Sequence, residues 1–141
     1  MIKELIREPL LLRLRSDDAT VDDLPVARDL RDTLIAHRAD CAGLSANMIG
    51  VNKRIIAFVN VSEMVPTYDV MLNPRIVSHS GERVAREECI LGDCKAHKRR
   101  RYKTVVVEYQ DLSMQICTKS FSGLTAQVIQ HEIDHCDGIA L

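Results

Sequence analysis

The segment that begins at Ser122 constrains the fold and chemistry of this chain more than any other. Ser122 is a helix-capping residue, and Gly138 stands where a left-handed residue often ends a helix, so a helix is expected over residues 123–136. Steps of four, three and four residues place four side chains on one face: Leu124, Val128, His131 and His135. Two histidines on an inward face need polar partners or a bound ion there.

The same helix carries the sequence His131-Glu132-Ile133-Asp134-His135, which fits the pattern H-E-x-x-H. Histidines four residues apart stand one turn above each other, so both imidazoles can bind one divalent ion. Glu132 is rotated away from that axis and can act on a water molecule without binding the ion. The pattern predicts a metallohydrolase centre, and the alternative is a pair of buried histidines with ordinary hydrogen-bond partners.

A catalytic centre of this kind needs a third protein ligand. Few residues follow His135, and the position at which an extended form of the pattern has a third histidine is Leu141. Leucine cannot bind a metal, so the third ligand must lie upstream, among cysteines, histidines or carboxylates. The best candidate is Cys89, which follows Glu87 and Glu88.

The rest of the chain predicts one helix and then strands. Asp22, Asp23 and Pro25 form a typical helix start, and an amphipathic helix is expected over residues 24–38. Apolar runs predict strands at 55–59, 68–72, 104–109 and 114–121, the last two joined as a hairpin. Strands followed by a helix with a polar buried stripe indicate the α+β class, in a single domain spanning 1–141.

Composition excludes several classes of protein. A formal net charge of -1 gives no field that attracts nucleic acid or an anionic membrane, so neither is expected as a partner. No apolar run is long enough for a membrane-spanning helix or a signal peptide, so a cytoplasmic location is expected. Five cysteines are an odd number, which argues against a disulfide framework. The basic run at 95–103 has Tyr102 as its one aromatic residue, and it is interpreted as a solvated loop.

With these residues in place, nearly the whole chain resembles the peptide deformylase family. Residues 41–48 resemble G-x-G-L-A-A-x-Q, residues 87–91 resemble E-G-C-L-S, and residues 130–138 match Q-H-E-x-D-H-x-x-G, in the family's order and spacing. The resemblance implies antiparallel sheets packed around a C-terminal metal-binding helix. It also implies removal of the formyl group from N-formylmethionyl peptides near the ribosome. The implied cofactor is one divalent ion, natively Fe²⁺, with Zn²⁺ or Ni²⁺ accepted.

The resemblance also assigns roles to single residues. Three residues are the implied metal ligands: Cys89, His131 and His135. Glu132 is the implied catalytic carboxylate. Gly43 would give the peptide backbone a close approach, and the Ile90 N–H would stabilise the oxyanion. Arg101 matches a family arginine and is expected to pair with Glu87.

Two of the motifs depart from the family pattern. Met48 replaces a glutamine that donates a hydrogen bond to the developing oxyanion, and losing one such donor costs about 10²–10³ in rate. Asn47 is expected in an extended segment, pointing away from Met48. Glu88 replaces the glycine before Cys89. These departures leave a second hypothesis open, a non-catalytic relative that binds metal and peptide; a zinc endopeptidase is a third, weakened by the lack of a downstream ligand.

Overall fold

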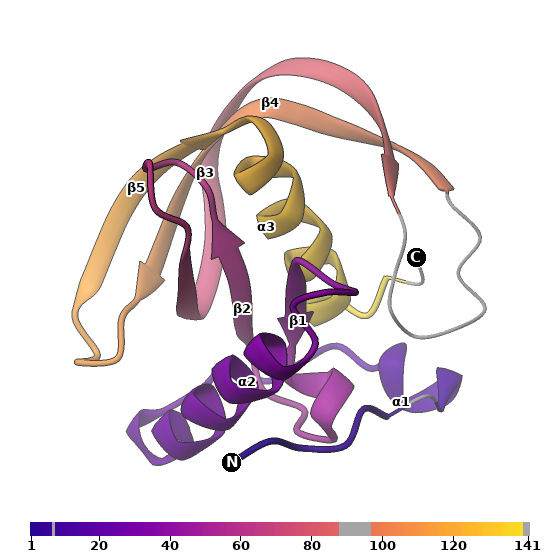
Figure 1. The fold of residues 1–141 in the computed structure, drawn as a ribbon, viewed down its shortest axis with the longest axis vertical. Helices are drawn as coiled ribbons and strands as arrows, with labels where there is room; N and C mark the ends of the chain where they lie inside the picture. Colours follow the sequence, from indigo (N-terminus) through magenta and orange to yellow (C-terminus); the bar gives the residue numbers. More distant parts are fainter. Residues whose placement is uncertain (7, 88–96, 140–141) are drawn as a thin grey trace.

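The computed structural model describes residues 1–6, 8–87 and 97–139, in which one antiparallel sheet lies between two helices (Figure 1). The described elements follow in the order α1 (Pro9–Leu12), the 3-10 turn η1 (Val21–Asp23), α2 (Leu24–Ala36), β1 (Gly43–Ser45), the 3-10 turn η2 (Ala46–Ile49), β2 (Ile55–Asn60), β3 (Thr67–Glu87), β4 (His97–Gln110), β5 (Ile116–Ser122) and α3 (Gly123–Cys136). The strands pair in chain order, and every pair is antiparallel. The α+β class with antiparallel strands around the C-terminal helix is therefore confirmed, the described strands forming one continuous sheet.

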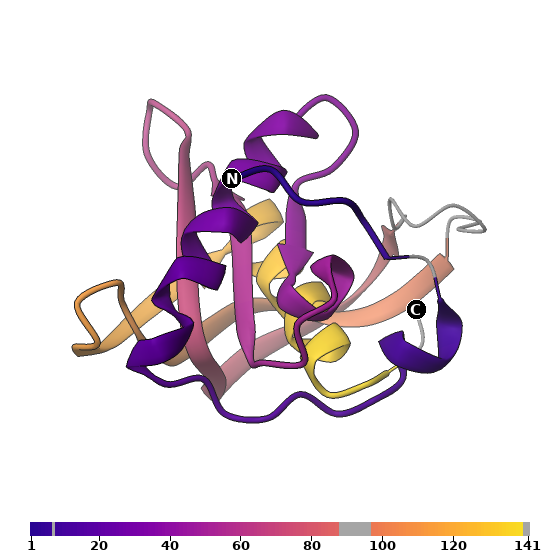
Figure 2. The same cartoon turned by 90° about the horizontal axis from the view of Figure 1, so that it is seen from below.

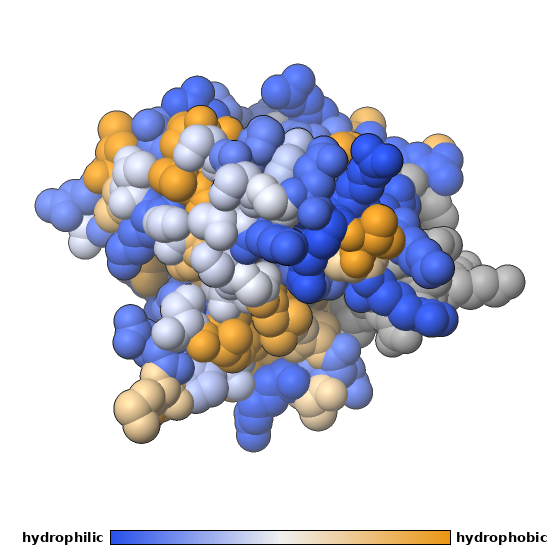
Figure 3. Space-filling view, turned by 90° about the horizontal axis from the view of Figure 1, so that it is seen from above, coloured by the Kyte–Doolittle hydropathy of each residue, from blue (hydrophilic) through white to orange (hydrophobic). Residues whose placement is uncertain are grey.

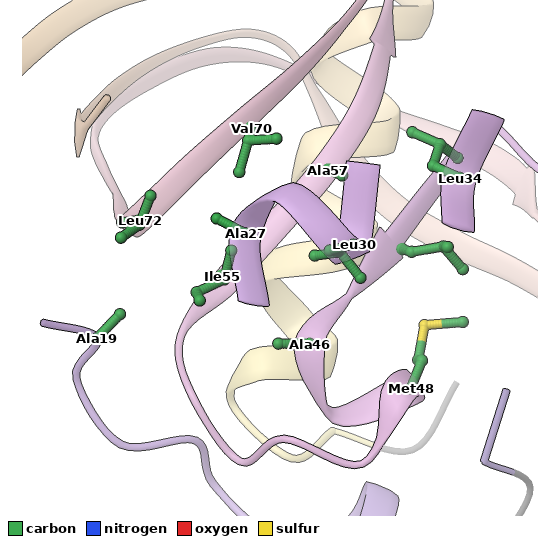
Figure 4. Packing of buried hydrophobic residues seen from close by; sticks show 11 residues of the cluster. Ala19, Ala27, Leu30, Leu34, Ala46, Met48, Ile55, Ala57, Val70 and Leu72 are labelled. Carbon is green, nitrogen blue, oxygen red and sulfur yellow. The ribbon is translucent and has the colours of Figure 1, made fainter. Parts of the chain in front are cut away.

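Strand β2 lies at the centre of the hydrophobic core, with both of its faces covered. Ile55 and Ala57 pack in the cluster beneath α2, whereas Ile56 and Phe58 pack in the cluster beneath α3. Figure 4 shows the first cluster, which includes Ala19, Ala27, Leu30, Leu34, Ala46, Met48, Ile55, Ala57, Val70 and Leu72. Because side chains alternate along a strand, a strand buried on both faces becomes an unbroken apolar run. This explains the run seen in the sequence.

Strands β3 and β4 are much longer than the sequence predicts, and they arch over α3 (Figures 1 and 2). The predicted strand at 68–72 is only the first part of β3. The β3–β4 register shifts between Leu72 and Arg75 and again between Ile76 and Ser78. Such irregularities bend a strand pair. The bend carries the far ends of both strands, with Glu87 and Arg101, to α3.

Helix α3 has the bounds expected from the sequence, and Gly138 has the expected positive φ of 74°. Two details differ. Ser122 precedes the helix, but its side chain makes no capping hydrogen bond; its Oγ lies 3.2 Å from Thr104 Oγ1. Leu124 is 57% exposed, so it does not belong to the buried face with the two histidines. The buried residues of α3 begin at Thr125, and Val128 is half-buried.

Helix α2 also begins where the sequence predicts, with Pro25 in its first turn. Asp23 does not cap it, because its carboxylate accepts the Thr20 N–H and closes a capping box on η1 instead. No helix in the described ranges has the length and hydrophobicity needed to cross a bilayer. On the face seen in Figure 3, hydrophobic residues form small separate groups among hydrophilic ones.

Candidate active site

Helix α3 presents His131 and His135 side by side in the protein interior. Both side chains are buried, and their Nε2 atoms lie 3.2 Å apart, with ring centroids 4.9 Å apart. Two imidazole nitrogens bound to one tetrahedral ion at about 2.0–2.1 Å would lie roughly 3.3 Å apart. The observed separation therefore fits a shared divalent ion.

Gln130 attaches α3 to strand β4. Its Oε1 accepts the Tyr102 N–H at 2.8 Å, and its Nε2 donates to the Tyr102 carbonyl at 2.9 Å. The amide thus pairs with both backbone groups of Tyr102 as a neighbouring strand would, and it sets the position of His131 beside Arg101. The sequence hypotheses gave Gln130 no such role. The available signal was an uncharged polar residue at a position that helical spacing places in the core.

Behind His131 lies a buried network of charges. Glu87 Oε1 lies 2.8 Å from His131 Nδ1, and Arg101 binds both oxygens of Glu87, at 2.7 and 2.8 Å. Arg101 also donates to Asp134 at 2.6 Å. The expected pairing of Arg101 with Glu87 is confirmed. Since a carboxylate only accepts, Nδ1 of His131 donates, and the Nε2 lone pair faces His135.

These surroundings set the charge of each group. Burial would raise the pKa of Glu87, but hydrogen bonds from His131 and Arg101 lower it to about 2, so this carboxylate stays ionised. Burial lowers the pKa of His135 to about 3 and keeps that ring neutral, as metal binding requires. Burial would also lower the pKa of His131, but the hydrogen bond to Glu87 and the negative charges of Glu132 and Glu87 together outweigh burial, so the pKa is raised.

Glu132 lies on the same helix and faces a pocket. It is 4% exposed, and its Oε1 has no hydrogen-bond partner in the described part of the chain. Burial raises the pKa of Glu132 to about 7. The residues that line the pocket include Asp40, Cys41, Ala42, Gly43, Met48, Arg86, Glu87, Gln127, Val128, His131 and Glu132. A buried carboxylate oxygen left without a partner at a pocket wall is placed to exchange a proton with a bound molecule.

Gly43, on β1, makes room for this carboxylate. A Cβ added there would lie 2.8 Å from Val128 Cγ1 and 2.9 Å from both Cγ and Oε2 of Glu132. The sequence suggested that Gly43 admits the substrate backbone. The structure supplies a further reason for glycine, which is the space taken by Glu132 itself.

We expect Gly43→Ala to displace Glu132 and to lower kcat/KM by about 10²-fold, since a shift of about 1 Å in a reacting group has that effect. Overpacking should also lower the free energy of unfolding by about 1–3 kcal/mol. Enzyme kinetics and urea unfolding measure the two effects. Gly123→Ala is the control for the kinetics alone: its Cβ would meet nothing within 4 Å, but its φ of 62° strains an alanine there and lowers stability for a different reason. Equal losses of activity in the two variants would contradict the steric explanation.

The turn η2 shows what the first motif does in this chain. Residues 46–49 form a 3-10 turn, so the expectation of an extended segment was wrong. Asn47 donates to the His135 carbonyl at 3.0 Å and therefore braces α3. Met48 lines the pocket, and its sulfur accepts the Ser45 N–H at 3.4 Å. Neither side chain donates a hydrogen bond to the pocket among the contacts described.

Part of the expected site lies outside the described residues, namely Cys89, Ile90 and Glu88. Within the described ranges, no three histidine, cysteine or acidic residues form a complete metal-binding group. The structure brings His131 and His135 together, and the role of these two residues and of Cys89 as metal ligands remains a prediction.

Comparisons with known proteins agree with this geometry. The model of the polypeptide deformylase family matches residues 7–141. A peptide deformylase of Clostridium beijerinckii is 41% identical over 141 residues, which is the whole of both chains. A peptide deformylase 2 of Xanthomonas campestris is 34% identical over 132 residues, covering 89% of this chain and 77% of the relative.

Solved structures give the same result. A peptide deformylase from Legionella pneumophila superposes with a TM-score of 0.85 at 29% identity, covering 99% of this chain and 83% of that one. A peptide deformylase from Thermus thermophilus gives a TM-score of 0.83 at 28% identity, covering 99% and 82%. Similarity over the whole length favours a hydrolase over a non-catalytic relative.

Proposed function

The chain belongs to the peptide deformylase family, and we propose that the centre on α3 removes the N-formyl group from the methionine that begins newly made peptides. Members of this family are metal-dependent hydrolases. The observation that carries the assignment to α3 is the buried Glu132 carboxylate, which has an oxygen without a partner among the described residues and stands beside two convergent imidazoles.

We propose that His131 and His135 hold the metal ion together with Cys89. A thiolate with two imidazoles suits Fe²⁺, Zn²⁺ and Ni²⁺, and Fe²⁺ is proposed as the native ion. When bound, the ion supplies Lewis-acid polarisation of the reacting groups. Glu87 orients the His131 ring through Nδ1, and Arg101 holds Glu87 in place.

Glu132 carries the proton transfers in this proposal. It takes a proton at Oε1 from the attacking water and delivers it to the amine nitrogen of the leaving peptide, so that formate and a free amino terminus are released. A carboxyl whose pKa is raised to about 7 is suited to both transfers near neutral pH. The Ile90 N–H is proposed to donate to the oxyanion, and Gly43 to let the peptide backbone approach Glu132.

Peptides that begin with formylmethionine are made by the ribosome, so we propose that the protein acts near the ribosome. On this basis we propose that the protein works in the cytoplasm, as a single domain over residues 1–141. No nucleic-acid or membrane partner is required for the reaction.

Formate release from formyl-Met-Ala-Ser, measured on protein purified without oxygen, tests the function. We expect turnover that falls at least about tenfold when a chelator removes the ion, and that returns when Fe²⁺, Zn²⁺ or Ni²⁺ is added. Protein that binds one equivalent of metal but releases no formate from this peptide would show the proposed function to be wrong.

A further inference from the structure

The pocket that Glu132 faces is not apolar throughout. Ala42 and Val128 line it near Glu132, but Gln127 and Arg86 form its wall on the side of α3 and β3. Gln127 lies one helical turn before His131, so it precedes the two histidines on the same face of α3. A peptide whose first residue reaches Glu132 would lie in a pocket that Arg86 and Gln127 bound on this side.

The Gln127 amide is held in one orientation by β3. Arg83 donates to Gln127 Oε1 at 2.7 Å, and Gln127 Nε2 donates to the Arg86 carbonyl at 3.4 Å. Its carbonyl end is therefore used by a cation, and its N–H end is directed toward Arg86. Nε2 therefore keeps one further N–H for an acceptor, whereas one of the two lone pairs of Oε1 is already used by a guanidinium.

Arg86 adds a positive charge to the same wall. Its side chain is exposed, and no carboxylate of the described residues lies within 4.0 Å of it. Among the described residues, three carboxylates line the pocket: Asp40, Glu87 and Glu132. Asp40 belongs to the segment before β1. Glu87 is already paired with Arg101 and His131. The wall formed by Arg86 and Gln127 thus presents a positive charge and an amide N–H, and it carries no negative charge.

We infer that Arg86, with Gln127 oriented by Arg83, makes the enzyme prefer formylated peptides with an acidic side chain in the first positions after the methionine. The inference rests on the proposed function, because it assumes that the formyl group lies beside Glu132. An acidic side chain would pair with the Arg86 guanidinium and accept from Gln127 Nε2. A basic side chain would meet the like charge of Arg86, with no carboxylate on this wall to pair with it.

The expected preference is moderate because Arg86 is exposed to solvent. Exposed ion pairs contribute about 0.2–1 kcal/mol, which is up to about fivefold in affinity. Since a glutamate gains the attraction and a lysine meets the repulsion, we expect kcat/KM for formyl-Met-Glu-Ser to exceed that for formyl-Met-Lys-Ser by about tenfold at low salt. The ratio should fall as salt is added.

The test compares formyl-Met-Glu-Ser, formyl-Met-Gln-Ser and formyl-Met-Lys-Ser with the metal-loaded wild type and with variants. Arg86→Gln should bring the Glu-to-Lys ratio close to one, and Arg86→Glu should invert it. Lys98→Gln is the matched control, because Lys98 is the cross-strand partner of Arg86 but does not line the pocket. In that control the ratio should stay within about twofold of the wild type.

A ratio that is the same in wild type and Arg86→Gln would overturn the inference, and so would an equal fall of the ratio in Lys98→Gln. Turnover of the neutral peptide formyl-Met-Gln-Ser tests the proposed function separately. If that peptide is not turned over, equilibrium binding of Met-Glu-Ser and Met-Lys-Ser still decides the inference. Weaker binding of Met-Glu-Ser to Arg86→Gln than to wild type supports it, and unchanged binding rejects it.

Discussion

Replacing Glu132 by glutamine is expected to lower kcat/KM for formyl-Met-Ala-Ser by about 10²–10⁴-fold, the usual contribution of a general acid–base group. The amide keeps the shape of the side chain but cannot take a proton from water at Oε1. Bound metal, measured by elemental analysis, should stay at the wild-type level, because Glu132 is not one of the proposed ligands. Since burial already disfavours the ionised carboxylate, the Tm of the metal-free variant should not fall below that of the wild type.

Glu108→Gln provides the control for this variant. Glu108 is exposed on β4 and pairs with Arg75 away from the pocket, so its loss should leave kcat/KM unchanged. If Glu132→Gln kept kcat/KM within about tenfold of the wild type, Glu132 would not be the proton carrier.

Arg101→Met should be among the most destabilising single changes in the chain. It removes the guanidinium that binds both oxygens of Glu87 and leaves that carboxylate buried, which typically costs about 3–5 kcal/mol. Asp134 suffers less, because its side chain is 24% exposed and water can replace the arginine. Urea unfolding of the metal-free protein measures the loss.

The double variant Arg101→Met with Glu87→Gln separates lost charge pairing from lost packing. Removing both charges of a buried pair costs less than removing one, so the double variant should be more stable than Arg101→Met alone. A double variant that is less stable than the single one would show that packing of the arginine side chain dominates.

The parts of the fold that the sequence predicted are those determined by local signals. The bounds of α3 follow from the residues at its two ends and from its helical period. Each of these signals involves residues only a few positions apart in the sequence. The extent of β3 does not follow from its own residues. Its outer half, with Val77 and Val84 exposed, is a strand because β4 pairs with it. Only its pairing with β4 distinguishes this outer half of β3 from a loop.

The candidate site divides in the same way. The spacing of His131 and His135 predicted that the two rings meet, since one helix holds both. The space that Gly43 leaves for Glu132 depends on the contact of β1 with α3. The bonds between Gln127 and β3 likewise join segments distant in sequence. A sequence pattern does not show which distant residues come into contact, so the roles of Gly43 and Gln127 could be seen only in the structure.

The attachment of Gln130 to the Tyr102 backbone joins residues 28 positions apart. Between them lie the β4–β5 turn and β5, which contribute no residue to the described pocket lining. Since the amide anchors the helix to the strand directly, the geometry of the histidines is insulated from the length of that turn. A change in the length of this turn should therefore leave the two histidines in place. A single residue gained or lost between Arg101 and Tyr102, or between Gln130 and His131, would instead misalign α3 relative to β4.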